Sequence, residues 1–180
     1  MPASRPSLDY AILGLLNKEP AAGYALRRIF QTTPLGIYSD SPGSIYPALR
    51  RLHRRGLVRT TRAQEGRRRR TYRITPRGRR TLRQWLEEPL TYSEVVGGQG
   101  GPELRLAFLS DFVAPDRVRV FLREFAVLLE RLYENLTATR KLIRSQLSTS
   151  GAIALDLGVA ITKARATWCR RRAGQLRRTA

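Results

Sequence analysis

Two arginine-rich segments of the sequence have the composition and spacing to bind a polyanion. The first, SPGSIYPALRRLHRRG, covers residues 41–56, and the second, EGRRRRTYRITPRG, covers residues 65–78. Between Arg50 and Arg83 the chain has fifteen arginines and a single acidic residue, Glu65, so this stretch carries a net charge of +14. The guanidinium group pairs with phosphate oxygens and guanine edges through parallel hydrogen bonds. This chemistry indicates binding to a nucleic acid.

The excess positive charge is localised in the chain. All 180 residues together have 34 basic and 14 acidic side chains, a formal net charge of +20. Six more arginines and no acidic residue lie between Arg165 and Ala180, and the rest of the chain has no net charge. A general preference for arginine codons would not cluster the residues in this way. The clustering therefore indicates an electrostatic footprint for a polyanion.

Apolar periodicity predicts that a helix presents the first group of arginines. Residues 7–20 and 21–34 each have an amphipathic helical pattern that ends at a proline, and a turn-rich link follows them. A third helix then ends at Gly56, with a core-facing stripe spaced at helical intervals: Ile45, Leu49 and Leu52. The arginines of this helix lie mostly on its other sides, where a partner can reach them.

Two starting points for the third helix fit the sequence. Ser41 can cap the helix and Pro42 can open it, since the missing N–H of a proline costs nothing at that position. Pro47 would then delete a backbone hydrogen bond and crowd the carbonyl of Gly43. Alternatively, the regular helix starts near Ser44, which places Pro47 inside the first turn. The sequence leaves both alternatives open.

The second group of arginines lies in a predicted β-hairpin. Residues 57–63 and 70–75 alternate apolar or β-branched residues with arginine, which is typical of strands, and the short segment between them contains a glycine. Thr75 and Pro76 are the residue types of a helix cap and of a first helical position, so a fourth helix follows. The order is therefore helix, helix, helix, hairpin, helix.

A helix with a buried apolar stripe and a basic outer face, followed at once by a basic hairpin, is the arrangement of a winged helix–turn–helix. In that fold the third helix enters the DNA major groove, where base pairs differ in donors and acceptors, and the hairpin contacts the flanking backbone. Arginines at the hairpin tip would neutralise phosphates and add affinity without sequence preference. The predicted DNA-binding arginines are Arg50, Arg51 and Arg54 of the helix and Arg67, Arg68, Arg69 and Arg70 of the hairpin.

The sequence predicts a mainly α protein of two domains joined by a linker. Residues 1–90 are expected to form the winged helix DNA-binding domain, with a two-stranded β-hairpin as its wing. Residues 91–101 contain four glycines within five positions and predict the linker. Residues 102–180 have one short and two long amphipathic helical patterns, which cannot close a core alone. The most direct partner is a second copy of the same helices, so these residues are expected to form the dimerisation domain of a homodimer.

The sequence resembles the PadR family of bacterial transcriptional regulators in three blocks that occur in order. The blocks are LDYAILGLLNKEPAAGYALRRIF, SPGSIYPALRRLHRRGLV and RRRRTYRITPRGRRTL, and they cover roughly the first half of the chain. The resemblance implies a homodimer that binds a palindromic operator in double-stranded DNA, usually as a repressor. It often implies release by a small hydrophobic or phenolic effector.

The resemblance also implies roles for individual residues. Ser44 and Tyr46 occupy positions from which the family presents DNA-facing groups, and Tyr24 occupies the tyrosine of its GY motif, where it either contacts phosphate or packs between helices. The family commonly has one or two basic residues at the wing tip, so the four arginines here suggest tighter and more salt-sensitive binding. Trp168 is either a core or interface residue or one that stacks on an effector.

Other classes of function have little support in the sequence. A single histidine, His53, and a single cysteine, Cys169, give no metal or cofactor pattern, and no Ser/His/Asp or phosphate-loop pattern is present. No apolar run approaches the ~18 residues of a membrane span, and no signal peptide is evident. We therefore expect a cytoplasmic, nucleoid-associated protein that is not an enzyme. The alternative is a basic architectural or RNA-associated protein that binds nucleic acid without sequence preference.

Overall fold

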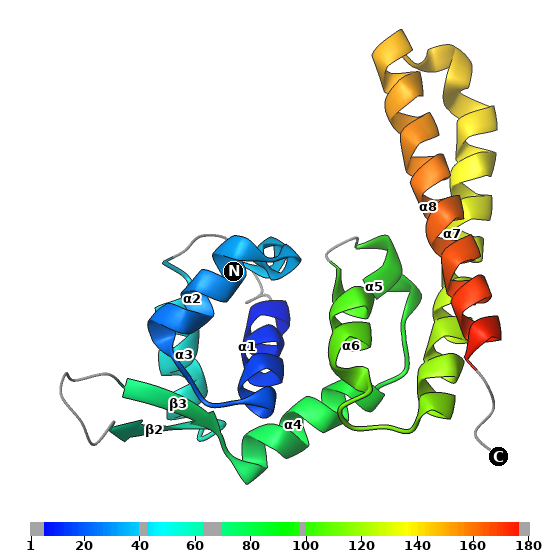
Figure 1. Ribbon diagram of the computed structural model, residues 1–180. Helices are drawn as coiled ribbons and strands as arrows, with labels where there is room; N and C mark the ends of the chain where they lie inside the picture. The colour runs from blue at the N-terminus through cyan, green and yellow to red at the C-terminus, as the bar shows by residue number, and fades with distance from the viewer. Residues whose placement is uncertain (1–5, 40–42, 63–69, 98–99, 177–180) are drawn as a thin grey trace. The chain divides into compact units, whose positions relative to one another are not determined.

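The computed structural model describes residues 6–39, 43–62, 70–97 and 100–176. They belong to two compact units, Met1–Glu88 and Pro89–Ala180 (Figure 1). The chain is mainly helical, with a small antiparallel sheet in the N-terminal unit, so the fold class predicted from the sequence is confirmed. Within the described ranges, no helix is both long enough and apolar enough to cross a membrane.

The N-terminal unit has the elements of a winged helix–turn–helix. In chain order these are α1 (Pro6–Lys18), β1 (Ala21–Ala22), α2 (Gly23–Thr32), the 3-10 helix η1 (Pro34–Tyr38), α3 (Ile45–Arg54), β2 (Val58–Arg62), β3 (Arg70–Ile74) and α4 (Pro76–Glu87). Strands β2 and β3 form the predicted hairpin, which we call the wing. Strand β3 also pairs with β1, so the sheet has three strands in the order β1-β3-β2. The sequence missed β1, because two alanines are too few to show an alternating pattern.

The apolar stripe predicted for the third helix is buried. Ile45, Leu49 and Leu52 have no exposed surface, and α3 packs on α1 and α2. At roughly 25 cal/mol per Å² of apolar surface removed from water, each such side chain stabilises the unit by about 1.5–3 kcal/mol. This stripe therefore fixes which side of α3 remains available to a partner.

Helix α3 begins at Ile45, which decides between its two predicted starts. Pro47 is the third residue of the helix and lies in the first turn, where no intrahelical partner exists for a backbone N–H. The start near Ser44 is therefore correct. The other predicted start, at Ser41 and Pro42, falls outside the described residues.

A close contact joins the end of α3 to the start of α4. Gly56 has a φ of +68°, in the left-handed region that favours glycine, and it follows the last turn of α3 as predicted. Thr75 caps α4 as predicted, because its Oγ1 accepts a hydrogen bond from the backbone N–H of Gly78 at 3.0 Å. The same hydroxyl donates to the carbonyl oxygen of Gly56 at 2.7 Å. These bonds hold the base of the wing against α3.

The C-terminal unit is helical throughout its described residues. Its elements are α5 (Tyr92–Val96), α6 (Gly101–Leu109), α7 (Pro115–Ile143), the 3-10 helix η2 (Arg144–Gln146) and α8 (Thr149–Gln175). Helices α7 and α8 pack side by side along most of their lengths and are joined by η2 (Figure 1). Their contact buries mainly large apolar residues of α7 and small residues of α8: Phe121, Phe125, Leu129, Ala166, Cys169 and Ala173.

Helix α5 lies in the segment for which the sequence predicts a linker. Thr91 and Glu94 form a capping box, in which the Thr91 hydroxyl accepts from the Glu94 N–H and the Glu94 carboxylate accepts from the Thr91 N–H. Glu94 Oε1 also accepts a hydrogen bond from Nη2 of Arg105 on α6 at 2.8 Å, and the Arg105 side chain is buried. This ion pair attaches α5 to α6, so part of residues 91–101 is helical and packed.

Candidate nucleic-acid interface

Three exposed side chains lie one turn apart on the same side of α3. Tyr46, Arg50 and Arg54 are spaced four residues apart, so they share a face opposite the buried stripe. We call these three residues the outer face of α3. Arg50 and Arg54 make no hydrogen bond or ion pair with any other described residue, so both guanidinium groups are available to an anion. This face has the chemistry that the sequence predicts for contact with DNA.

The other arginines in this part of α3 are directed toward α1. Arg51 donates from Nε to Oδ2 of Asp9 at 3.1 Å and from Nη2 to Oδ1 at 2.5 Å, and Nη1 of Arg55 lies 3.7 Å from Asp9 Oδ2. Asp9 is only 6% exposed. Its hydrogen bonds raise the pKa of the Arg51 guanidinium. The structure places Arg51 in an ion pair that holds α3 on α1, and its contact with DNA stays a prediction.

Replacing Asp9 with asparagine is expected to destabilise the N-terminal unit. The change removes a charge-assisted pair of hydrogen bonds and leaves Arg51, which is partly exposed, to be hydrated instead. We expect a loss of about 1–2 kcal/mol, which lowers the Tm of an 88-residue unit by roughly 4–16 °C. Calorimetry of the full chain measures the shift. The control is Asp156→Asn, in an exposed ion pair of the C-terminal unit, and equal Tm values for both variants would contradict the role of Asp9.

Ser44 and Tyr46 lie at the start of α3, but only Tyr46 is directed outward. Ser44 is half-buried, and its Oγ lies 2.7 Å from Oγ of Ser39, so the two hydroxyls are hydrogen-bonded to each other. Tyr46 is 39% exposed, and its ring lies against Gly23, the first residue of α2. Tyr24 is 55% exposed. The structure thus brings the two predicted tyrosines to neighbouring positions at the starts of α2 and α3.

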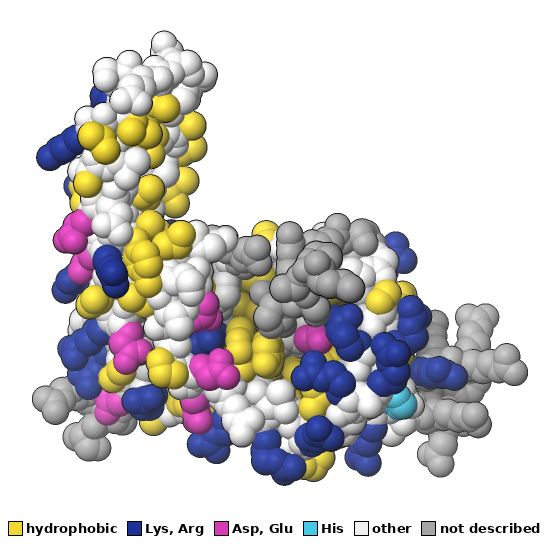
Figure 2. Space-filling view, turned by 180° about the vertical axis from the view of Figure 1, so that it is seen from behind, with side chains coloured by type: hydrophobic (Ala, Val, Ile, Leu, Met, Phe, Trp, Pro, Cys, Tyr) yellow, Lys and Arg dark blue, Asp and Glu magenta, His cyan; other side chains and the backbone are white. Residues whose placement is uncertain are grey.

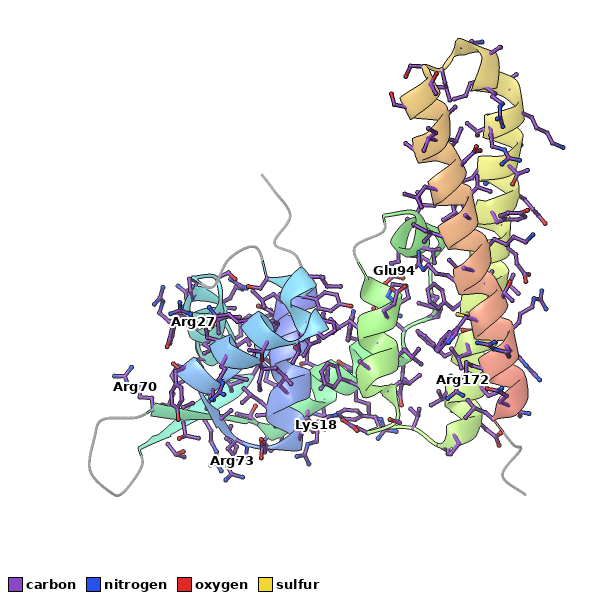
Figure 3. The ribbon with its side chains drawn as sticks, turned by 45° about the horizontal axis from the view of Figure 1, so that its top comes forward. Lys18, Arg27, Arg70, Arg73, Glu94 and Arg172 are labelled. Carbon is purple, nitrogen blue, oxygen red and sulfur yellow. The ribbon has the colours of Figure 1, made fainter. Side chains whose placement is uncertain are left out.

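Helix α2 contributes two arginines that sequence reasoning missed. Arg27 and Arg28 are exposed and, with Tyr24 and Gln31, occupy one stripe of α2 opposite the buried Leu26 and Phe30. Figure 3 shows Arg27 on the outside of the helix. Charge counting overlooked both because they lie outside the two arginine-rich segments. The helical spacing from Tyr24 is the signal that could have identified them.

The register of the wing places arginines on both of its faces. Arg59 pairs with Arg73 and Arg62 with Arg70 across the strands, and alternation puts position 70 on the same side as the buried Ile74. Figure 3 shows Arg70 at the far end of the wing and Arg73 on the opposite side. Like charges directly opposite each other destabilise a β-ladder. A bound polyanion would relieve that repulsion.

Basic side chains gather over α3 and the adjoining elements. Figure 2, which views the molecule from behind relative to Figure 1, shows them around the single histidine of the N-terminal unit. Arg70, described at the start of β3, is exposed. Arg67, Arg68 and Arg69 lie outside the described residues, so their assignment to the wing tip remains a prediction.

Acidic residues partner two of the C-terminal arginines. Arg165 pairs with Glu103 of α6, and Arg170 pairs with Glu130 of α7. The hydrogen bond from Arg170 lowers the pKa of the Glu130 carboxyl. These pairs connect helices of the C-terminal unit, so this group of arginines is at least partly structural. Trp168, proposed for effector binding, is 43% exposed on α8.

The single histidine and the single cysteine lie in unrelated places. His53 is exposed on α3, whereas Cys169 is 2% exposed between α7 and α8. Burial raises the pKa of the Cys169 thiol to about 11. Within the described ranges, no group of three or more His, Cys, Asp or Glu side chains could hold a metal ion.

Two curated transcriptional regulators resemble part of the chain. Rv3488, a transcriptional regulator of Mycobacterium tuberculosis, is 50% identical over 66 residues, which are 34% of this chain and 60% of that protein. The negative transcriptional regulator PadR of Bacillus subtilis is 35% identical over 81 residues, or 44% of each protein. The matched region thus spans about half the length of these relatives. A crystal structure of B. subtilis PadR with operator DNA matches 94% of this chain and 99% of its own, at 22% identity and a TM-score of 0.42.

A family model also matches part of the chain. Residues 12–84 match the transcriptional regulator PadR-like family. They include most of α1, both arginine-rich segments and the wing, and they end within α4. With its winged helix fold, the N-terminal unit of this chain is similar to the PadR-like family of transcriptional regulators over these residues.

Proposed function

We propose that this chain is a dimeric, sequence-specific DNA-binding protein that represses transcription. The observation that carries the proposal is the division of the α3 side chains. Ile45, Leu49 and Leu52 are fully buried on one side. On the other side, the outer face presents a tyrosine and two arginines that pair with no other described residue. A helix with this division can enter the major groove without losing its packing.

The outer face of α3 is suited to base contacts. Arginine donates bidentate hydrogen bonds to O6 and N7 of guanine, and an aromatic ring packs against the methyl group of thymine. Arg50 and Arg54 would supply the first kind of contact and Tyr46 the second. Because the Asp9–Arg51 ion pair fixes α3 on α1, the outer face is held rigid before DNA binds.

The basic residues around α3 are suited to the DNA backbone. Arg27 and Arg28 of α2 and Arg70 of the wing are exposed, and Arg67, Arg68 and Arg69 add charge at the predicted wing tip. Contacts of this kind release counterions and supply affinity that does not depend on sequence. They would position the protein so that α3 can select among base pairs.

The C-terminal unit is suited to dimerisation through α8. An exposed apolar stripe runs along this helix at spacings of four, four and seven residues: Ile153, Leu157, Ile161 and Trp168. A second copy of the chain would cover these residues. Two-fold related α3 helices would then contact half-sites whose centres lie about 34–36 Å apart, or a multiple of one DNA turn, so the operator would be palindromic.

Regulation by a small molecule completes the proposal. The resemblance to the family implies a hydrophobic or phenolic effector that releases the DNA, and the exposed indole of Trp168 could stack on such a molecule. Repression itself is supported by the description of the Bacillus subtilis relative as a negative regulator.

Selection of bound sequences from random duplex DNA tests the proposed function. We expect a two-fold symmetric consensus, a dimer mass in solution, and binding to the selected sequence at least ~10³-fold tighter than to a scrambled duplex at physiological salt. Equal binding to both duplexes would favour the alternative, a basic architectural or RNA-associated protein. Competition with single-stranded RNA of equal length tests the RNA-associated form of this alternative.

A further inference from the structure

The ring of Tyr46 occupies space that only a glycine at position 23 leaves open. A Cβ added to Gly23 would lie 2.7 Å from Cε1 and 3.4 Å from Cδ1 of that ring. Carbon atoms in contact prefer separations of about 3.5–4.0 Å. The next nearest atom, Cδ1 of Leu49, would be at an ordinary distance of 3.5 Å. An added methyl group would therefore displace the Tyr46 ring and little else.

The backbone of Gly23 is anchored on its other side by the sheet. Ala21 and Ala22 form β1 and pair with Tyr72 and Thr71 of β3, and Gly23 follows directly as the first residue of α2. Gly23 is buried, whereas Tyr46 is 39% exposed. Because the backbone just before Gly23 is paired and Tyr46 is partly exposed, the ring is the part that would move.

We propose that Gly23 determines DNA sequence specificity through Tyr46, without itself contacting DNA. The inference rests on the proposed function, in which the outer face of α3 contacts base edges. An alanine would push the ring roughly 1 Å outward to restore a normal contact distance. Productive recognition geometry tolerates only about 0.5 Å. Gly23 is thus a positioning residue for the tyrosine that selects bases.

Gly23→Ala should leave the Tm unchanged or raise it, but it should lower the DNA sequence specificity. Alanine is favoured over glycine in a helix and lowers the entropy of the unfolded chain, so the Tm should be equal to or above that of the wild type. Discrimination between the selected operator and a scrambled duplex should fall about tenfold, the usual effect of one lost base contact. Affinity for the scrambled duplex and its salt dependence should stay unchanged, because every arginine is retained.

A double-mutant cycle on the full chain tests this role. Wild type, Gly23→Ala, Tyr46→Ala and the double variant are compared for Tm and for binding to both duplexes. The control is Gly158→Ala on α8, where a Cβ would meet nothing within 4 Å. We expect Gly23→Ala and Tyr46→Ala to lose discrimination similarly, and the double variant to lose no more than Tyr46→Ala alone.

Three results would overturn the inference. The first is a Gly23→Ala variant that discriminates between the two duplexes as well as the wild type does. The second is a double variant that discriminates less well than Tyr46→Ala by the same factor that Gly23→Ala loses in the wild type, which would mean that Gly23 acts through other atoms. The third is failure of Gly23→Ala to fold, because the ring would then not be the part that yields. A wild-type chain that selects no sequence would instead refute the proposed function, and it would do so before any variant is compared.

Discussion

Replacing Arg67, Arg68, Arg69 and Arg70 together with alanine is expected to weaken binding to every DNA sequence about 10³-fold per half-site at 0.15 M salt. Each phosphate contact contributes about 0.9 to the slope of log K against log salt concentration, so four contacts contribute roughly 3.6. The resulting difference in affinity between variant and wild type is close to zero near 1 M salt and reaches about three powers of ten at 0.15 M. The ratio of specific to non-specific binding should stay nearly constant, because these residues contact the backbone.

Binding isotherms over a range of salt concentrations measure this effect. The matched control removes four charges from the C-terminal unit, through Arg117, Arg123, Arg171 and Arg172, which are exposed in the structure. The proposed function assigns the C-terminal unit to dimerisation and not to DNA contact, so the control should retain most of the wild-type slope. Equal slopes for the wing variant and the wild type would refute the assignment of these arginines to phosphate contacts.

The second large effect is expected from Gly78→Ala, which should destabilise the N-terminal unit by about 3 kcal/mol or more. A Cβ at Gly78 would lie 2.1 Å from the carbonyl oxygen and 3.0 Å from the carbonyl carbon of Leu57, and 2.9 Å from Cγ1 of Ile74. Two of these three atoms belong to the backbone, which cannot turn aside as a side chain can. The contact between α4 and the backbone of Leu57, which follows α3, would have to open.

Thermal unfolding of the full chain shows the result directly. The transition of the N-terminal unit should fall by about 10 °C or more, since 1 kcal/mol shifts the Tm of a domain of this size by roughly 4–8 °C. Gly158→Ala is again the control, because the same substitution in open helical surroundings should be neutral or stabilising. A Gly78→Ala protein that melts at the wild-type temperature would show that the contact between Gly78 and Leu57 is looser than described.

The sequence was sufficient to predict features that depend on local spacing. The stripe of Ile45, Leu49 and Leu52, the cap at Thr75 and the turn at Gly56 follow from residue types within a few positions of one another. The wing followed from alternation in two neighbouring strands. The structure agrees with these predictions because each depends only on residues that are close together in the sequence.

The partition of the α3 arginines could not be predicted in the same way. Arg50 and Arg51 are adjacent and chemically identical, yet only Arg51 meets Asp9, which lies 42 positions earlier in the chain. That difference depends on how α1 packs against α3, a tertiary contact. The contact of Gly23 with Tyr46 is equally non-local, since it requires β1, which has only two residues.

Helix α5 could have been predicted from a signal that was present. Thr91 and Glu94 have the spacing of a capping box, and the structure contains both of its hydrogen bonds. The nearby glycines outweighed this pattern and favoured a linker. The capping box predicts the start of a short helix at Thr91, and the run of glycines begins only at position 97, where that helix has ended.

The central claim is that the outer face of α3 and the wing together form one DNA-binding surface. Site-directed cleavage of operator DNA tests it most directly, with a reagent attached in turn to Arg54→Cys on α3, Thr61→Cys on the wing and Arg123→Cys on α7. Selective attachment is feasible because Cys169 is buried and its thiol pKa is raised to about 11. The account predicts cuts within each half-site from position 54, cuts at its flank from position 61, and none from position 123. Cleavage from only one of the first two positions, or from position 123 alone, would contradict it.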